Sequence, residues 1–253
     1  MDHRDSGGGR QANVSRRIFL AGASGAVGRQ LLPLLLAAGH NVTGTTRTPA
    51  KAEALRSLGA RPVVVDALDA DALSRAVLAA RPDIVMHQLT DLPDALDPSK
   101  MDDAIVRNAR LRDEGTRNLV QAALAAGAHR LVVQSIVWSY APGPEPHGED
   151  DPLDLTAADE RGITVRGAAM LEWWATNAPP LEAVILRYGF FYGPGTGFYT
   201  PHEVPPLHVD AAAHAAMLAV DRGLGLYNIA EPSAYASIER ARRDLGWSDS
   251  FRC

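Results

Sequence analysis

Short apolar runs alternate with amphipathic stretches along most of this chain. The runs that predict strands cover residues 17–21, 41–45, 62–65, 84–87, 130–134 and 182–187. The stretches with helical periodicity cover residues 25–38, 50–58, 69–80, 102–126 and 163–177. Strands that alternate with helices are typical of a parallel sheet with helices on both faces. The pattern therefore predicts an α/β fold with a doubly wound parallel sheet.

Three spaced glycines follow the first predicted strand, in the segment 22–28, GASGAVG. In a strand-turn-helix unit the first glycine permits the tight turn, and the second lets the backbone approach a pyrophosphate. The third lets the helix pack on the strand, and the helix N-terminus attracts the anion. A glycine-rich turn without a ligand is the alternative. The position directly after a strand favours a dinucleotide site in a Rossmann fold.

The order of elements changes after Pro194. A Pro- and Gly-rich passage over 193–206 precedes an alanine-rich helix near 210–221, a strand at 226–229 and a last helix near 233–245. We expect residues 1–16 to be a disordered leader, and residues 17–253 to form one NAD(P)-binding domain. A small substrate lid around 190–210 and the C-terminal helices belong to that domain. Pro33 is expected to bend the first helix, since it removes a hydrogen bond.

Composition excludes several classes of function. The 253 residues are 46% hydrophobic and 22% charged, with a formal net charge of −5. Basic residues are scattered, so no nucleic-acid surface is expected. No apolar run reaches membrane-spanning length. The single cysteine, Cys253, excludes an internal disulfide and a cysteine-based metal site, and we expect no metal. A twin-arginine export signal at residues 15–20 is the weaker interpretation, since the glycine motif interrupts it; a cytoplasmic protein is expected.

The second predicted strand ends at Thr46-Arg47, where NAD-preferring folds place an acidic residue for the ribose hydroxyl. The guanidinium of Arg47, with Lys51 nearby, suits the extra 2′-phosphate of NADP instead. We therefore expect NADP(H) in preference to NAD(H), although a solvated loop charge is the alternative. Asp66 is a candidate acceptor for the adenine amine, and Asp69 a candidate helix N-cap. His87 is expected to be a structural residue.

Several landmarks of the chain resemble the extended short-chain dehydrogenase/reductase family, which includes nucleotide-sugar epimerases and dehydratases. The resemblance covers about residues 17–252. It depends on the glycine motif, on Asp66 and on the segments 114–119 (EGTRNL), 186–194 (LRYGFFYGP), 208–212 (HVDAA) and 241–247 (ARRDLGW). The residues then expected to contact the cofactor are Gly22, Ser24, Gly25, Ala26, Val27, Gly28, Arg47, Lys51, Asp66, Ala67, Gln88, Leu89, Thr90, Gln134, Ser135, Tyr188, Gly189, Phe190 and Phe191.

The resemblance also implies a catalytic serine and a Tyr-x-x-x-Lys pair, in which the lysine lowers the pKa of the tyrosine. Alignment on Glu172 puts Thr164 at the tyrosine position and Ala168 at the lysine position. Ser135 lies one place before the serine position, and a shift of one residue turns a strand side chain to the other face. The candidate proton donors are therefore Ser135, Thr90, Thr164 and Tyr140. For Tyr140, a structural role at the strand-loop junction is favoured over that of a displaced acid.

The missing pair directs the functional hypothesis. We expect an NADPH-dependent ketoreductase that reduces a small or polycyclic aromatic, polyketide-like substrate, with the proton taken from water or from the substrate's own phenol. In lacking this pair, the chain resembles atypical family members in antibiotic biosynthesis, such as angucyclinone ketoreductases. The alternatives are an NADP-binding sensor without chemistry and a nucleotide-sugar epimerase or dehydratase. The expected partner is a small molecule, and the chain is expected to be a monomer or a homodimer.

Overall fold

The computed structural model describes residues 14–93 and 96–253. Seven parallel strands form the central sheet in the order β3-β2-β1-β4-β5-β6-β9. Their bounds are β1 (Arg17–Ala21), β2 (Asn41–Thr46), β3 (Arg61–Val64), β4 (Ile84–His87), β5 (Arg130–Ile136), β6 (Glu182–Tyr188) and β9 (Gly225–Ile229). The strand order changes direction between β1 and β4, as it does in a doubly wound fold. The predicted fold class is confirmed.

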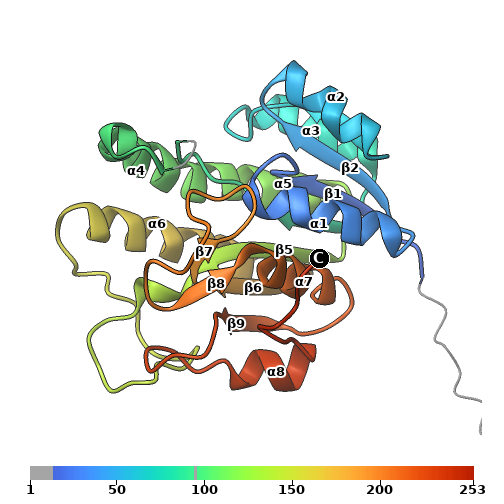
Figure 1. Ribbon diagram of the computed structural model, residues 1–253. Helices are drawn as coiled ribbons and strands as arrows, with labels where there is room; N and C mark the ends of the chain where they lie inside the picture. The colour runs from blue at the N-terminus through green and yellow to red at the C-terminus, as the bar shows by residue number, and fades with distance from the viewer. Residues whose placement is uncertain (1–13, 94–95) are drawn as a thin grey trace, which may run out of the picture.

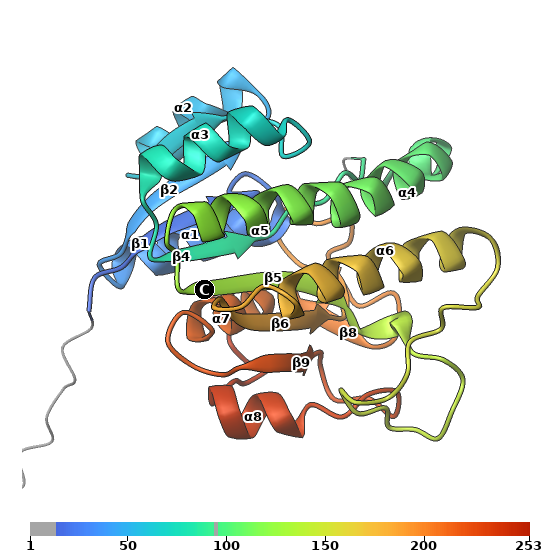
Figure 2. The same cartoon turned by 180° about the vertical axis from the view of Figure 1, so that it is seen from behind.

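Helices cover both faces of this sheet (Figures 1 and 2). One face carries α1 (Ala26–Ala37) and α7 (Val209–Leu218), which share a core of leucine, alanine and valine side chains with the strands. The other face carries α3 (Ala70–Ala80), α5 (Thr116–Ala125) and α6 (Asp159–Thr176) over a second core. The remaining helices are α2 (Pro49–Ser57), α4 (Met101–Arg110) and α8 (Glu239–Leu245).

Most predicted elements lie within a few residues of the observed ones, and three features differ. The single helix expected over 102–126 is divided into α4, a π-helical turn η3 (Leu111–Gly115) and α5. Helix α6 begins at Asp159, four residues before the expected start, and α8 begins at Glu239, six residues after it. The lid region contains an unexpected parallel pair of short strands, β7 (Phe190–Tyr192) and β8 (Pro206–His208).

The expected leader and the expected bend at Pro33 concern the start of the chain and helix α1. Residues 1–13 of the expected leader lie outside the described residues, whereas Ser15 donates to the Gly39 carbonyl at 2.7 Å. Pro33 lies on the exposed side of α1, where the lost hydrogen bond faces solvent, and the helix continues past it to Ala37. Within the described part of the chain, no helix has the length and apolarity that a membrane crossing needs.

Candidate functional site

The three glycines form a backbone cradle at the carboxyl ends of β1 and β4. Gly22 has a φ of +90°, and a Cβ there would lie 2.4 Å from the Gln88 carbonyl oxygen. A Cβ on Gly28 would lie 2.1 Å from the Gly22 carbonyl oxygen, so helix α1 packs against the turn without a side chain between them. Gly25 is the N-cap of α1, with no side-chain cap and no acidic residue in the first turn. The amide groups that begin α1, including those of Ala26 and Val27, are thus free for an anion.

The end of β2 holds this turn in place. The Gly22 amide donates to the Thr45 hydroxyl at 3.1 Å, and the Ser24 hydroxyl donates to the Thr46 hydroxyl at 3.3 Å. The Gln88 side-chain amide on the other side is enclosed, and neither of its polar atoms completes a hydrogen bond, although the Tyr188 hydroxyl lies near it. A cradle without side chains beside an unsatisfied buried amide fits a dinucleotide phosphate and its ribose.

Arg47 follows β2 at the edge of this cradle and is already engaged in an ion pair. Its Nη1 lies 2.8 Å from Asp91 Oδ1, and Arg107 Nε lies 3.3 Å from Asp91 Oδ2. The Asn108 side chain accepts a hydrogen bond from the Asp91 amide at 2.9 Å, which fixes the carboxylate between the two arginines. Lys51 lies on the exposed side of α2. A positive charge therefore lies where the sequence predicts it, and an internal carboxylate competes for it.

Asp66 and Ala67 form the turn after β3. One Asp66 carboxylate oxygen accepts from the Leu68 amide at 3.0 Å, and the Asn118 side chain donates to the Ala67 carbonyl at 3.0 Å. Asp66 is exposed, and its contact with adenine stays a prediction. Asp69 accepts from the Ala72 amide at 2.9 Å, which confirms it as the N-cap of α3.

His87 is a structural residue at the end of β4, as expected. Its ring is fully buried, its Nδ1 accepts from the Leu89 amide at 3.2 Å, and its Nε2 therefore donates to the Thr116 hydroxyl at 3.0 Å. Burial lowers the pKa of His87 to about 4, so the ring is neutral at physiological pH. Gln134 Nε2 donates to the Leu89 carbonyl at 3.2 Å and joins β5 to the same loop.

Ser135 belongs to a buried ionic cluster, which disfavours a role as a proton donor. Its hydroxyl donates to Glu172 Oε1 at 2.6 Å, and the same carboxylate accepts from Arg187 Nε and Nη2 at 2.8 and 2.6 Å. All three residues are more than nine-tenths buried. A buried carboxylate needs these donors because burial without them is costly. The Ser135 side chain is directed at α6, as the one-residue offset predicts.

Tyr140 completes this cluster, so the structural alternative is favoured over a displaced acid. Its hydroxyl donates to Asn228 Oδ1 at 2.7 Å and accepts from Arg187 Nη1 at 2.8 Å. The residue is 2% exposed, and burial raises the pKa of its phenol. Tyr188 is likewise enclosed in the core and donates to the Ala212 carbonyl at 3.3 Å, so its side chain is not free for a cofactor.

The two positions of the expected Tyr-x-x-x-Lys pair carry no acid and no amine. Thr164 is half-buried on α6, and its backbone carbonyl accepts from Arg112 Nη1 at 3.3 Å. Ala168 is completely buried. Thr90 is exposed beyond β4. Of the four candidate donors, only the hydroxyls of Thr164 and Thr90 are outside the ionic cluster, and both are far weaker acids than a phenol.

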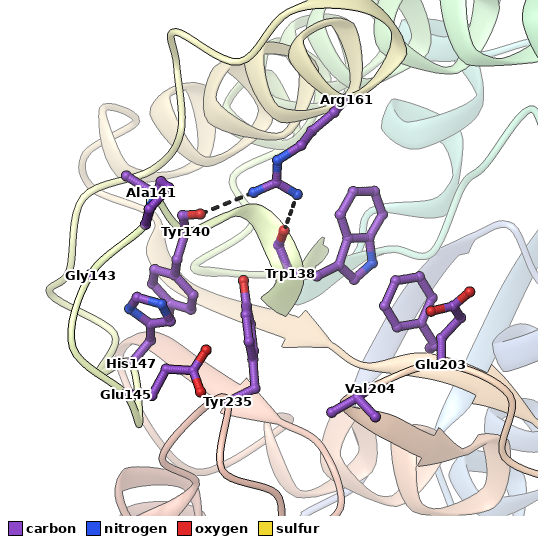
Figure 3. Close-up of a pocket in the computed structure, with 12 residues that line it drawn as sticks. Trp138, Tyr140, Ala141, Gly143, Glu145, His147, Arg161, Glu203, Val204 and Tyr235 are labelled. Atoms are coloured by element: carbon purple, nitrogen blue, oxygen red, sulfur yellow. Dashed lines mark hydrogen bonds between the residues drawn. The ribbon is translucent and has the colours of Figure 1, made fainter.

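A pocket of about 500 Å³ opens between the loops that follow β5 and β6 (Figure 3). Trp138 and Phe190 stack at 5.3 Å between ring centroids, with 9° between their planes. Tyr235 and His147 line the opposite side. Arg161 donates to the carbonyls of Trp138 and Tyr140 at 2.9 and 3.0 Å, which holds the loop after β5 beside α6.

The lid contributes Phe190, Glu203 and Val204 to the same pocket. Gly189 lets the two loop segments approach closely, since a Cβ there would lie 2.6 Å from the Pro205 carbonyl oxygen. His202 stacks on Phe198 at 3.5 Å and contacts Phe190 edge-on at 6.2 Å, whereas Phe191 packs in the core beside Tyr188. The sequence indicated this region as the substrate pocket but did not identify Trp138, Tyr235 or Arg161. An aromatic residue directly after β5 was the available signal. Among the described residues, no three metal-ligating side chains gather at one point.

Two curated reductases are similar to this chain. A 3-diazoavenalumate denitrifying reductase from Streptomyces sp is 46% identical over 184 residues, which cover 72% of this chain and 58% of the relative. A 4-hydroxy-2-methyl-3-oxo-4-farnesyl-3,4-dihydroquinoline-1-oxide ketoreductase from Stigmatella aurantiaca is 25% identical, over 83% of this chain and 66% of the relative. The chain thus spans less than two thirds of the length of either relative.

The fold is also that of solved structures. The UDP-glucose 4-epimerase of Thermotoga maritima, crystallised with UDP-glucose, superposes with a TM-score of 0.73 over 93% of this chain and 94% of that one. The two sequences are 17% identical, so the likeness concerns the fold alone. Residues 22–198, from the first glycine of the cradle to the lid, match the family described as NAD(P)H-binding. The chain therefore belongs to this NAD(P)H-binding family and has a Rossmann-type fold.

Proposed function

We propose that this protein is an NADPH-dependent reductase that transfers a hydride to a planar aromatic, natural-product-like substrate without an acid from the protein. One observation carries the proposal. An aromatic pocket adjoins the carboxyl edge of a sheet with a dinucleotide cradle, and the expected tyrosine and lysine positions on α6 hold Thr164 and Ala168. Binding and orientation remain, and these supply a large part of a rate enhancement.

The pocket walls favour a flat substrate. Trp138 and Phe190 present nearly parallel rings, and aromatic faces of this kind bind planar groups by offset stacking. The lid is short and carries aromatic rings. A nucleotide-sugar would need donors and acceptors for several hydroxyls and two phosphates, whereas Arg161, the cation lining the pocket, already donates to three protein acceptors.

The chemistry of the acceptor then decides where a proton is needed. A reduced nicotinamide supplies a hydride, so a ketone that accepts it becomes an alkoxide and needs one proton. A phenol next to the carbonyl can give that proton and become a phenolate. Such a substrate makes the absence of a tyrosine tolerable, which supports a ketoreductase that depends on its substrate. Water beside Thr164 or Thr90 is the other source.

The Streptomyces relative favours a second acceptor, because its name describes a reductase that removes nitrogen from a diazo compound. An arenediazonium that accepts a hydride gains a C–H bond and loses its C–N bond as dinitrogen. The positive charge of the diazonium cancels the negative charge of the hydride, so both products are neutral and no proton is needed. A site without an acid suits this reaction even better than it suits ketone reduction.

The test is to supply both acceptors. Purified protein with NADPH is given 1-hydroxy-2-acetonaphthone or a hydroxylated arenediazonium, and the 340 nm absorbance, the reduced product and released dinitrogen are measured. Consumption of NADPH with a matching amount of either product supports the reductase. Tight NADPH binding without oxidation by either probe favours the sensor, and conversion of a UDP-sugar with bound cofactor favours the epimerase.

A pair of tryptophan variants locates the substrate. Trp138→Ala is expected to raise KM about tenfold, because stacking and burial at one ring contribute about 1–2 kcal/mol. Trp173→Ala serves as the control, since Trp173 is 50% exposed on α6 and does not line the pocket. An equal effect of both substitutions would place the substrate elsewhere. The NADP preference expected from Arg47 belongs to this proposal.

A further inference from the structure

Arg112 is a buried cation with almost no partners. The residue is 7% exposed, and its only hydrogen bond to a described residue runs from Nη1 to the Thr164 carbonyl at 3.3 Å. Its Nε and Nη2 have no such acceptor. Neither of these two nitrogens is completely enclosed. Arginines are rarely buried unless a carboxylate neutralises them, so this one needs a reason.

The carboxylates near Arg112 are committed elsewhere. Glu172 attracts its charge through space but is held by Ser135 and Arg187. Asp113, the next residue along the chain, accepts from the Trp174 indole at 2.7 Å. Burial accordingly lowers the pKa of Arg112 to about 10, which still leaves the guanidinium charged at neutral pH. It is a fixed positive charge with free donors.

The fold brings this charge to the positions of the missing pair. Residue 112 lies in the π-helical turn η3 and contacts α6 through the Thr164 carbonyl. Gly167 lets helix α4 approach helix α6 closely, since a Cβ at this position would lie 2.9 Å from Ala109 Cα. Arg112 contacts the backbone of Thr164, at the expected tyrosine position and one turn before Ala168, and its charge also lowers the pKa of His87.

We propose that Arg112 is the cation of the hydride-transfer site, in place of the lysine that Ala168 does not supply, and that its ligand is an acidic hydroxyl of the aromatic substrate. This inference rests on the proposed function. In ketone reduction the substrate's phenolic O–H bond breaks, the proton goes to the oxygen of the carbonyl carbon that has gained the hydride, and the phenolate oxygen accepts hydrogen bonds from the N–H groups of Arg112. For a hydroxylated diazonium the hydroxyl loses its proton to water and the same contact holds the phenolate, while the hydride forms a C–H bond and the C–N bond breaks to release dinitrogen.

The test measures the ionisation of a bound phenol rather than turnover. 1-Hydroxy-2-acetonaphthone is titrated by its ultraviolet spectrum while bound to the protein with NADP⁺, which cannot donate a hydride. We expect the wild type to lower the pKa of the bound phenol by at least one unit, about a tenfold change in ionisation. Arg112→Lys is expected to keep most of this shift, and Arg112→Met to remove it. NADPH binding, followed by fluorescence, should change less than threefold.

The controls separate this inference from the function on which it rests. Arg110→Met removes a solvent-exposed cation at the end of α4, two residues before Arg112 and paired with Glu114, and should leave the phenol unchanged. Should Arg112→Met not fold, Arg112→Lys against Arg112→Gln gives the same comparison. A phenol pKa equal in wild type and Arg112→Met, or a wild type that does not shift it, overturns the proposal even if reduction proceeds. An Arg112-dependent shift without any reduction supports the proposal and refutes the reductase.

Discussion

The choice between NADPH and NADH depends on the competition for Arg47. Asp91 holds the guanidinium at 2.8 Å across the edge of the cradle, and Arg107 shares the same carboxylate. A 2′-phosphate that binds Arg47 has to displace Asp91 or share the arginine with it. We therefore predict that Asp91→Asn tightens NADPH binding, although it removes an ion pair.

The size of the effect follows from exposure. The Arg47 side chain is 54% exposed and that of Asp91 is 19% exposed, and ion pairs of this kind contribute about 0.2–1 kcal/mol. Their release should tighten NADPH binding by up to about fivefold. Loss of Arg47 itself removes charged hydrogen bonds to phosphate of about 1.5–3 kcal/mol, so Arg47→Gln should weaken NADPH binding about 10- to 150-fold.

The assay is a fluorescence titration of NADPH and of NADH against the wild type, Asp91→Asn, Arg47→Gln and the double variant. NADH lacks the 2′-phosphate and serves as the internal control, since its Kd should change less than twofold. Raised salt should shrink every NADPH difference, because these charges are exposed. Weaker NADPH binding by Asp91→Asn, or an equal loss of both cofactors in Arg47→Gln, would refute the reasoning.

Three further predictions concern the glycine cradle, the loss of folding stability at acid pH and the buried ionic cluster. Gly28→Ala should lose NADPH binding and at least about 2 kcal/mol of stability, because its Cβ would lie 2.1 Å from a carbonyl oxygen. Gly148→Ala, which has open space around its Cβ, should change neither the melting temperature in calorimetry nor the Kd in an NADPH titration. His87 has a folded pKa of about 4, so the unfolded chain alone takes a proton below pH 6.5. Stability is therefore full above that pH and falls by about 2–3 kcal/mol as the pH drops to 4. His87→Gln should reduce the loss of unfolding free energy between pH 6.5 and pH 4, measured by urea titration at each pH. His129→Gln, on the exposed surface, should leave that loss unchanged. Glu172→Gln leaves a buried arginine without its carboxylate and should cost about 3–5 kcal/mol in urea unfolding, and an unchanged midpoint would contradict the ion pair.

The sequence predicted the strands and the cradle because both depend on local rules. Apolar runs between turns mark buried parallel strands, and the glycine spacing is imposed by backbone contacts that any side chain would block. The π-helical turn at residues 111–115 escaped prediction because its residues have ordinary helical periodicity. Only packing against α6 distinguishes the extra residue in that turn.

Side-chain partners were harder to predict than elements. Ser135 was a candidate donor because of its position beside the family serine, but its Glu172 partner lies 37 residues away and is reached only through the packing of α6 on β5. Tyr140 meets Asn228 across 88 residues for the same reason. Hydrogen bonds between distant segments leave no periodic trace in the sequence, so the ionic cluster could not be recognised before the fold was known.

Arg187 and Arg112 are both buried, but their hydrogen-bond partners differ, and this difference separates a structural arginine from a functional one. Arg187 donates to both oxygens of Glu172, to Tyr140 and to the Glu149 carbonyl, and these bonds raise its pKa. These bonds use four of its five N–H groups, and a cation so fully neutralised serves to hold β6 against α6. Arg112 has a single neutral acceptor among the described residues, and burial lowers its pKa. Such a charge destabilises the folded chain unless something else binds it, and strongly perturbed groups of this kind gather at functional sites. The missing lysine thus directs attention to Arg112 rather than to the hydroxyls of Ser135 and Tyr140, which stabilising bonds already occupy.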